Sequence, residues 1–154
     1  MGNLAQERLG IAVSAISASR TVLAQTVDYC AQRQAFGKRV LDMQNTRFTL
    51  AGLAARFDAV EMFLDQLILR HNRGDVSGDD AAKVKLLRTE LQQDIAGKGL
   101  QLHGGYGFMR EYPVARAYLD APIQTIFGGT SEIMREIIGR TLESDNSTTA
   151  VDRR

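Results

Sequence analysis

Two short stretches at opposite ends of the chain carry residues able to hold or transform a small molecule. Gly128 and Gly129 directly precede Thr130-Ser131-Glu132, where the pattern indicates the start of a helix. Glycines let the main chain approach a ligand closely, and the free amides at a helix start suit a phosphate or a carbonyl oxygen. Taken alone, however, such a stretch is more often an ordinary loop followed by a helix cap.

The second stretch is Gln6-Glu7-Arg8, at the beginning of a long amphipathic segment. A carboxylate held in an apolar pocket can act as a general base, because desolvation raises its pKa. In isolation Glu7 would simply be a favourable acidic residue in the first turn of a helix, and Arg8 a surface ion-pair partner.

The middle of the chain offers further binding groups but indicates no metal site. The forked donors of Arg33 match phosphate oxygens, although an arginine at a helix end more often interacts with the last carbonyls of that helix. We expect His103 to make a polar contact, and His71 to be a partly buried structural residue. Because these two histidines and Cys30 lie far apart in the sequence, they do not form a metal-binding set.

The elements that position these groups are expected to be helices. Residues 4–100 contain no proline, and their apolar residues recur at spacings of three and four rather than two. These spacings predict a first helix over roughly 4–34, and a third helix that Ser77 or Asp79 caps and that runs to Gly104. The second helix carries a coiled-coil-like seam of Leu50, Leu53, Phe57, Val60, Leu64, Leu67 and His71. The apolar stripe of the third helix is Val84, Leu87, Leu91, Ile95 and Leu102.

The last third of the chain is expected to be more broken. A short helix over residues 114–120 should end at Pro122, and a final helix should cover Ser131–Leu142. The tail, residues 143–154, is polar and is predicted to be disordered. The fold class is therefore all-α: an up-down, four-helix-bundle-like domain over residues 1–142, followed by this tail.

Size and charge exclude several classes of protein. The 154 residues suffice for one core, and a net charge of +1 gives no general attraction to nucleic acid or to anionic membranes. The longest uncharged run near the beginning, residues 9–19, is much shorter than the roughly 20 residues that a membrane span needs. No signal peptide is visible, so we expect a cytoplasmic protein.

Four motifs, in the same order and at matching intervals, resemble the carboxy-terminal helical domain of the acyl-CoA dehydrogenases. They are Leu4-Ala5-Gln6-Glu7-Arg8-Leu9, Arg33-Gln34-Ala35-Phe36-Gly37-Lys38, Gln101-Leu102-His103-Gly104-Gly105-Tyr106-Gly107 and Ile126-Phe127-Gly128-Gly129-Thr130-Ser131-Glu132. Each motif is weak by itself, but the resemblance extends over residues 4–142. It implies an FAD-dependent enzyme that converts an acyl-CoA to the trans-2-enoyl-CoA. A base takes the α proton in that reaction, and the flavin takes a hydride from the β carbon.

The resemblance also implies which residue is the base. Most of the family carries a glutamate at the position of Gly128, whereas a minority, including the long-chain and isovaleryl enzymes, carries the base on the first helix of this domain. Glu7 occupies that second position, so it is the expected catalytic base. Gln6, Arg8, Gly128 and Gly129 would belong to the substrate site, with the amide of Gly128 donating to the thioester oxygen.

The same resemblance implies a set of FAD contacts. The stretches around Arg33 and Gln101 would bind the flavin dinucleotide of a neighbouring subunit, which implies a homo-oligomer, either a dimer or a tetramer. The whole expected set is Arg33, Phe36, Gln44, Gln101, Leu102, His103, Gly104, Gly105, Thr130, Ser131 and Glu132. The implied partners are an acyl-CoA substrate and an electron-transfer flavoprotein or similar acceptor.

The chain is much shorter than the members of this family. Their amino-terminal helical domain and central β domain have no counterpart here, so we expect little or no dehydrogenase activity from this chain by itself. It would be a fragment, the product of an internal start, or a subunit completed by another polypeptide. Two alternatives stay open: a non-catalytic helical oligomerisation or assembly module, and a related flavin oxidase or monooxygenase domain.

Overall fold

The computed structural model describes residues 2–151, and the side chains of residues 4–143. As the sequence predicts, the described chain is almost entirely helical. Its longer helices are α1 (Gly2–Gln32), α2 (Gln44–His71), α3 (Gly78–His103), α4 (Pro113–Gln124) and α5 (Ser131–Val151). Between them lie the strands β1 (Gln34–Ala35) and β2 (Lys38–Arg39) and the 3₁₀ turns η1 (Val40–Asp42) and η2 (Gly104–Phe108).

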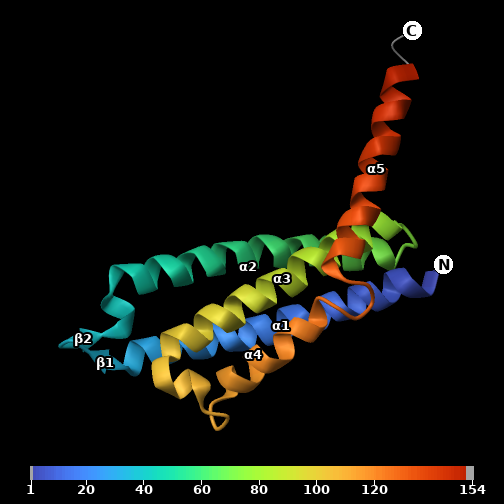
Figure 1. The fold of residues 1–154 in the computed structure, drawn as a ribbon. Coiled ribbons are helices and arrows are strands. Elements are labelled where there is room, and N and C mark those ends of the chain that lie inside the picture. Colours follow the sequence, from blue (N-terminus) through green and yellow to red (C-terminus); the bar gives the residue numbers. More distant parts are fainter. Residues whose placement is uncertain (1, 152–154) are drawn as a thin grey trace.

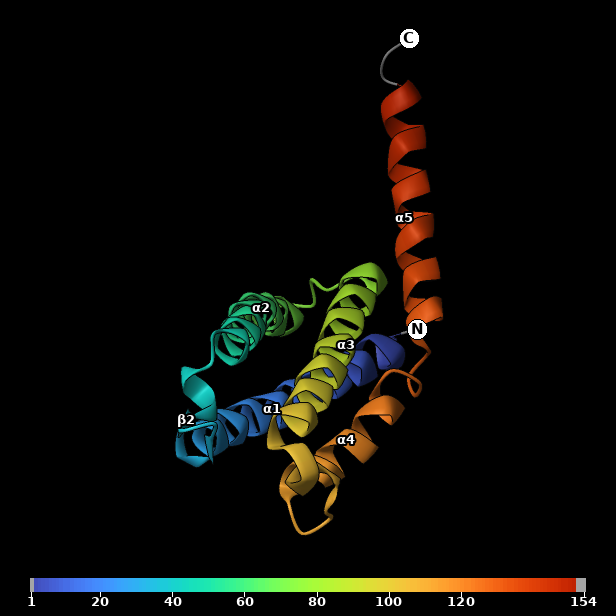
Figure 2. The same cartoon turned by 60° about the vertical axis from the view of Figure 1, so that its left-hand side comes forward.

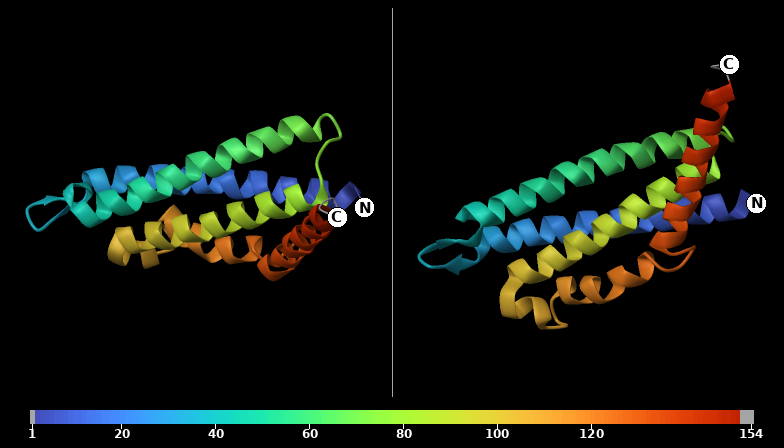
Figure 3. Two further views of the ribbon diagram at one scale, coloured as in Figure 1. Left: turned by 90° about the horizontal axis from the view of Figure 1, so that it is seen from above. Right: turned by 45° about the horizontal axis from the view of Figure 1, so that its top comes forward.

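The long helices run up and down beside one another. Figure 1 shows α1, α2 and α3 lying lengthwise together, each running opposite to the one before it. α1 packs most extensively against α3, and α4 contacts α3 and α1 on the side away from α2 (Figure 2). α5 leaves the bundle steeply, close to the end where the chain begins (Figure 3). The expected all-α, bundle-like architecture is therefore confirmed.

The core lies where the apolar faces of α1, α2 and α3 meet. The seam predicted for α2 is largely correct, and its buried members are Leu50, Leu53, Phe57, Leu64 and Leu67. Val60 is only partly buried. His71, predicted to be partly buried, is instead exposed, because it is the last residue of α2 and lies beyond the region that the neighbouring helices cover.

α3 is the central helix, and one apolar stripe does not describe its buried surface. Leu87, expected inside, is 45% exposed, whereas Lys85 and Arg88 are fully buried. The three side-chain nitrogens of Arg88 find no hydrogen-bond partner among the described residues. Burial lowers the pKa of Arg88 to about 10, although the charges of Glu61 and Asp65 on α2 raise it. The prediction for α3 failed in part because a helix with neighbours on several sides buries most of its circumference.

The chain turns from α1 into α2 through a small hairpin that the sequence pattern does not indicate. β1 and β2 pair antiparallel, and the two residues between them, Phe36 and Gly37, have φ angles of 52° and 77°. Two successive positive φ angles are typical of the tight hairpin turn whose twist matches that of paired strands. Because the hairpin begins at Gln34, α1 ends at Gln32 and not at Gln34 as predicted.

Two helix ends also differ from expectation. α4 starts at Pro113 and continues through Pro122 to Gln124, so the prediction that Pro122 ends this helix is wrong. A proline removes one helical hydrogen bond, but here it lies in the last turn, where little helix remains to be disturbed. α5 continues past Leu142 to Val151. Residues 152–154 of the expected tail lie outside the described residues, and the domain boundary at residue 142 stays a prediction.

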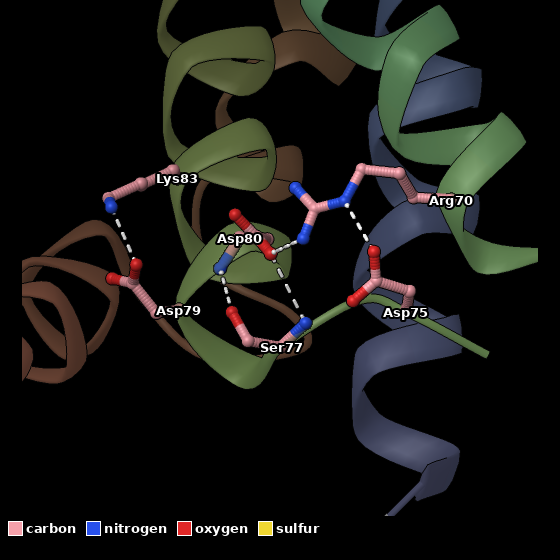
Figure 4. Close-up of polar contacts among 6 residues, drawn as sticks. All are labelled: Arg70, Asp75, Ser77, Asp79, Asp80 and Lys83. Carbon is pink, nitrogen blue, oxygen red and sulfur yellow. Dashed lines mark hydrogen bonds and ion pairs between the residues drawn. The ribbon is translucent and has the colours of Figure 1, made fainter. Parts of the chain in front are cut away.

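Figure 4 shows how the α2–α3 turn fixes the start of α3. Ser77, not Asp79, is the N-cap: its Oγ accepts a hydrogen bond from the Asp80 amide at 3.0 Å, and the Asp80 carboxylate accepts one from the Ser77 amide at 3.2 Å. Arg70, near the end of α2, donates to the same carboxylate at 2.9 Å and to Asp75 at 3.4 Å. This reciprocal cap ties the central helix to its neighbour.

Candidate functional site

The first turns of α1 meet the glycine pair that precedes α5. Nε of Arg8 donates a hydrogen bond to the Gly128 carbonyl at 3.2 Å. A Cβ atom built on Gly128 would lie 3.9 Å from Oε1 of Glu7. Two segments that are far apart in the sequence, and that we expected at one substrate site, therefore lie against each other.

Gly128 and Gly129 adopt a backbone conformation that residues with a side chain rarely adopt. Gly128 has a φ angle of 66° and Gly129 one of 105°. A Cβ on Gly128 would lie 2.5 Å from Cδ1 of Ile11, and one on Gly129 would lie 2.7 Å from Cε of Met134. A side chain at position 128 therefore needs both a strained backbone and a displaced Ile11 side chain. Glycine is therefore the residue that this backbone and this contact with Ile11 accommodate without strain.

Glu7 lies beside the glycine pair but is not enclosed by the described residues. Its side chain is exposed, whereas the neighbouring Ile11 is 8% exposed. The described residues leave this carboxylate open to solvent.

Lys85 of α3 also belongs to this site, and the sequence reasoning missed it. Its Nζ is fully buried and donates a hydrogen bond to the Gly129 carbonyl at 2.7 Å. Burial lowers the pKa of the Lys85 ammonium, and the charge of Arg8 lowers it further, while Glu132 and Glu90 raise it. A signal existed, because a lysine directly follows Val84, a member of the predicted apolar stripe of the third helix. The sequence does not reveal, however, that Lys85 contacts the Gly129 carbonyl.

The start of α5 completes this end of the molecule. Ser131 is 8% exposed, and its amide donates to the Thr125 carbonyl at 3.1 Å. Oγ1 of Thr130 accepts from the amide of Ile133 at 3.4 Å. Hydrogen bonds from its own backbone amide and from the Thr130 hydroxyl lower the pKa of Glu132. An open cavity of about 360 Å³ lies over this helix start and includes Thr130, Ser131 and Glu132 in its lining.

A second cavity, of about 510 Å³, lies at the other end of the bundle, between the end of α1 and η2. It gathers many of the residues expected to contact FAD. Its lining is Tyr29, Arg33, Val40, Gln101, Leu102, His103, Gly104, Gly105, Tyr106 and Met109.

Aromatic rings give this second cavity its form. Tyr29 stacks on His103 with ring centroids 4.1 Å apart, and the guanidinium of Arg33 lies 5.6 Å from the centre of the Tyr106 ring. The Tyr29 hydroxyl donates to the His103 carbonyl at 3.1 Å, and Nδ1 of His103 is 2.7 Å from the Gly99 carbonyl. Flat rings beside a guanidinium suit a ligand that joins a planar base to a phosphate. Tyr29 and Tyr106 were not singled out from the sequence, although Tyr106 lies within a quoted motif.

The expected cofactor contacts do not all come together. Phe36 is 96% exposed at the tip of the hairpin, and Gln44 is exposed at the start of α2. Neither is among the lining residues of the second cavity. Glu7 and Arg33 lie at opposite ends of α1, roughly 40 Å apart at the usual rise of 1.5 Å per residue.

Within residues 2–151, no helix has the length and apolar character that crossing a membrane requires.

Comparison with known proteins agrees with this fold. The family described as acyl-CoA dehydrogenase, C-terminal domain, matches residues 1–143. The mitochondrial long-chain specific acyl-CoA dehydrogenase of Mus musculus is 42% identical over 95% of this chain and 34% of its own length. The crystal structure of an acyl-CoA dehydrogenase from Geobacillus kaustophilus superposes with a TM-score of 0.90 at 40% identity, over 92% of this chain and 37% of its own. A subunit of the caffeyl-CoA reductase-Etf complex of Acetobacterium woodii is 32% identical over 88% of this chain and 36% of its own length.

The chain thus spans about a third of the length of the curated relatives that it matches. The match covers the helices that carry both cavities, from α1 to the beginning of α5. This chain belongs to the acyl-CoA dehydrogenase C-terminal domain family.

Proposed function

We propose that this chain provides the carboxy-terminal helical part of an FAD-dependent acyl-CoA dehydrogenase, which converts an acyl-CoA to the trans-2-enoyl-CoA. The observation that carries the proposal is the contact between the beginning of α1 and the glycine pair. Oε1 of Glu7 lies 3.9 Å from the point where a Cβ of residue 128 would lie, and Cδ1 of Ile11 makes a closer contact with that point at 2.5 Å. A carboxylate on either segment would therefore reach the same region.

In this proposal Glu7 is the catalytic base. Its carboxylate takes the α proton of the acyl thioester, while the amide of Gly128 donates to the thioester oxygen, where negative charge develops. Gln6, Arg8 and Gly129 complete the substrate site. When FAD is bound, it supplies the acceptor for the hydride that leaves the β carbon.

The residues present fit an FAD dinucleotide in two separate places. At the second cavity Arg33 would face a phosphate, and the rings of Tyr29 and Tyr106 would border the adenine. At the other end Thr130 and Glu132 would contact the flavin ring. Because the two places lie at opposite ends of α1, we infer that each FAD uses two copies of the chain. A homodimer or homotetramer follows from this arrangement.

The electron acceptor of the proposed enzyme is an electron-transfer flavoprotein or a similar carrier. The support is a relative whose name places it in a caffeyl-CoA reductase-Etf complex. A cytoplasmic location stays a prediction, which fractionation of cells that produce the protein would test.

The first experiment is the visible absorption spectrum of the purified chain after incubation with FAD and desalting. A retained flavin band would support the two FAD-binding places, and Arg33→Ala should then weaken binding. Lys98→Ala, an exposed change elsewhere on α3, is the matched control. A colourless chain would mean that these contacts alone do not hold the cofactor.

The decisive experiment uses a chimera. Residues 4–142 would replace the matching segment of the Geobacillus kaustophilus acyl-CoA dehydrogenase, so that the remaining domains come from a relative of known structure. We expect flavin reduction by acyl-CoA in this chimera, and a fall of roughly 10²- to 10⁴-fold in Glu7→Gln with the flavin still bound.

Glu136→Gln is the control, because Glu136 is an exposed glutamate that pairs with Arg140 on α5. Full activity in Glu7→Gln would refute the assignment of the base. An inactive chimera, together with a chain that forms a stable oligomer without affinity for FAD or acyl-CoA, would instead favour a helical assembly module.

A further inference from the structure

Two cations from different helices hold the two successive carbonyls of the glycine pair. Arg8 of α1 donates to the Gly128 carbonyl at 3.2 Å, and Lys85 of α3 donates to the Gly129 carbonyl at 2.7 Å. The Arg8 side chain is partly exposed, whereas Lys85 is fully buried. The loop between α4 and α5 is thus anchored by side chains from two helices, α1 and α3.

Burying an ammonium group inside a helix bundle is unfavourable, because the charge loses its hydration. Burial lowers its pKa, as does the charge of Arg8, while the carboxylates of Glu132 and Glu90 partly offset both effects. An apolar side chain of similar length would pack there without such a cost. The Lys85 ammonium donates a hydrogen bond to the Gly129 carbonyl, which an apolar side chain could not do.

We propose that Lys85 is a positioning residue for the candidate base site, holding the glycine pair so that the Gly128 amide and Glu7 face one substrate. The proposal deepens the proposed function and rests on it for the identity of that substrate, an acyl thioester. Lys85 itself touches neither the substrate nor the reacting atoms.

The glycine pair needs such anchors because of its own composition. Glycines have the largest backbone freedom of all residues, and Gly128 and Gly129 both adopt positive φ angles. A hydrogen bond from a cation to each carbonyl restricts both peptide groups at once. Each bond also polarises its peptide group, so that the N–H on the other side becomes a better donor. Through Lys85 this N–H is that of Thr130, the residue before α5.

The test compares Lys85→Met, which removes the donor but keeps the length, with Lys85→Arg, which keeps a cationic donor. Lys98→Met is the matched control, because Lys98 is exposed on the same helix. Amide hydrogen exchange of this chain, followed by NMR, reports the order of the loop directly. The Ser131 amide donates to the Thr125 carbonyl at 3.1 Å, and we expect Lys85→Met to speed exchange of this amide by about tenfold or more, with the interior of α3 still protected.

A merely structural role for Lys85 makes a different prediction. In that case Lys85→Met would speed exchange throughout α1 and α3 and change the loop no more than the rest. Unchanged exchange of the Ser131 amide, or equal effects of Lys85→Met and Lys85→Arg, would overturn the proposal.

The chimera adds a second readout. With the flavin still bound, Lys85→Met should lower kcat by about tenfold or more with a smaller change in KM, and Lys85→Arg should recover part of the loss. A kcat equal to that of the parent chimera would count against positioning. If the parent chimera is inactive, the proposed function fails, yet the exchange experiment still decides whether Lys85 orders the loop.

Discussion

Glu7 and Gly128 face each other across the junction of α1 with the loop before α5, with 3.9 Å between Oε1 of Glu7 and the point where a Cβ of residue 128 would lie. With the Ile11 side chain out of the way, a carboxylate from either segment could approach the same region. The two positions at which the resemblance implies a catalytic base are thus neighbours in this chain.

This relationship predicts that the base can be moved. In the chimera, Glu7→Gln should abolish turnover, and adding Gly128→Glu should restore part of it. Ile11 blocks the new side chain, since its Cδ1 lies 2.5 Å from the Cβ position, so Ile11→Ala should be included to make room. Flavin reduction by acyl-CoA in a stopped-flow instrument is the measurement. Equal activity with and without Gly128→Glu would show that the two positions do not serve one α carbon.

The backbone of the glycine pair predicts opposite effects for two similar substitutions. Gly128→Ala should lower the free energy of unfolding by about 1–3 kcal/mol, because its φ of 66° and the Ile11 contact both oppose a side chain. Gly52→Ala, in an exposed part of α2 with open space around the Cβ position, should raise it by roughly 0.5–1 kcal/mol. Urea unfolding of both variants tests the pair, and destabilisation of both would contradict it.

The cap of α3 predicts how stability depends on pH. Burial raises the pKa of Asp80, but hydrogen bonds from Ser77 and from Arg70 outweigh it, so that the pKa lies below its ordinary value of 3.8. The unfolded chain then binds more protons than the folded one in this range. The contribution of Asp80 is therefore complete above pH 3.8 and is lost as the pH falls through the lowered value.

The variant Asp80→Asn should remove that contribution, so its stability deficit should be larger at pH 7 than at pH 3. Asp75→Asn is the matched control, because the Asp75 side chain is 75% exposed and its bond to Arg70 is 3.4 Å long. Urea unfolding at both pH values measures the difference. A deficit of Asp80→Asn that is the same at both would mean that this carboxylate has an unperturbed pKa.

The buried guanidinium of Arg88 predicts a stabilising substitution. None of its three side-chain nitrogens has a hydrogen-bond partner among the described residues, so its desolvation is poorly compensated. Arg88→Met should raise the free energy of unfolding by about 1–4 kcal/mol. Arg56→Met, which removes an exposed pair with Asp94, should change it by at most about 1 kcal/mol. A large loss of stability in Arg88→Met would show that Glu61 and Asp65 satisfy the charge.

The sequence predicts helices best where one face of the helix is buried. α2 borders the bundle, so its periodic seam corresponds closely to its buried side. α3 lies between neighbours, and the periodicity rule says nothing about Lys85 or Arg88, which depend on groups from other helices. The hairpin between α1 and α2 escaped prediction because two-residue strands have no periodicity to detect.

At the candidate site, too, some features could be predicted from the sequence, whereas others depend on contacts between distant residues. The resemblance placed Glu7 and Gly128 in one site, and the structure puts them side by side. The structure also brings Arg33 and the residues around His103 into the lining of one cavity, while their role in binding FAD stays a prediction. Lys85 and Tyr29 were missed because each acts on a partner distant in the sequence, namely the Gly129 carbonyl and the His103 ring. Local sequence patterns do not reveal contacts between residues that are far apart in the sequence.

Under the proposed function, the separation of Glu7 from Arg33 along α1 predicts that two inactive or impaired variants can complement each other. If every active centre draws its base from one copy and its phosphate contact from another, two differently damaged chains can repair each other. Glu7→Gln, which lacks the base, and Arg33→Ala, which binds FAD weakly, would together regain turnover when co-assembled, because some centres would combine the intact halves. Because the length of α1 separates the two residues, the effect of a mutation in one copy would then depend on the other copies in the oligomer.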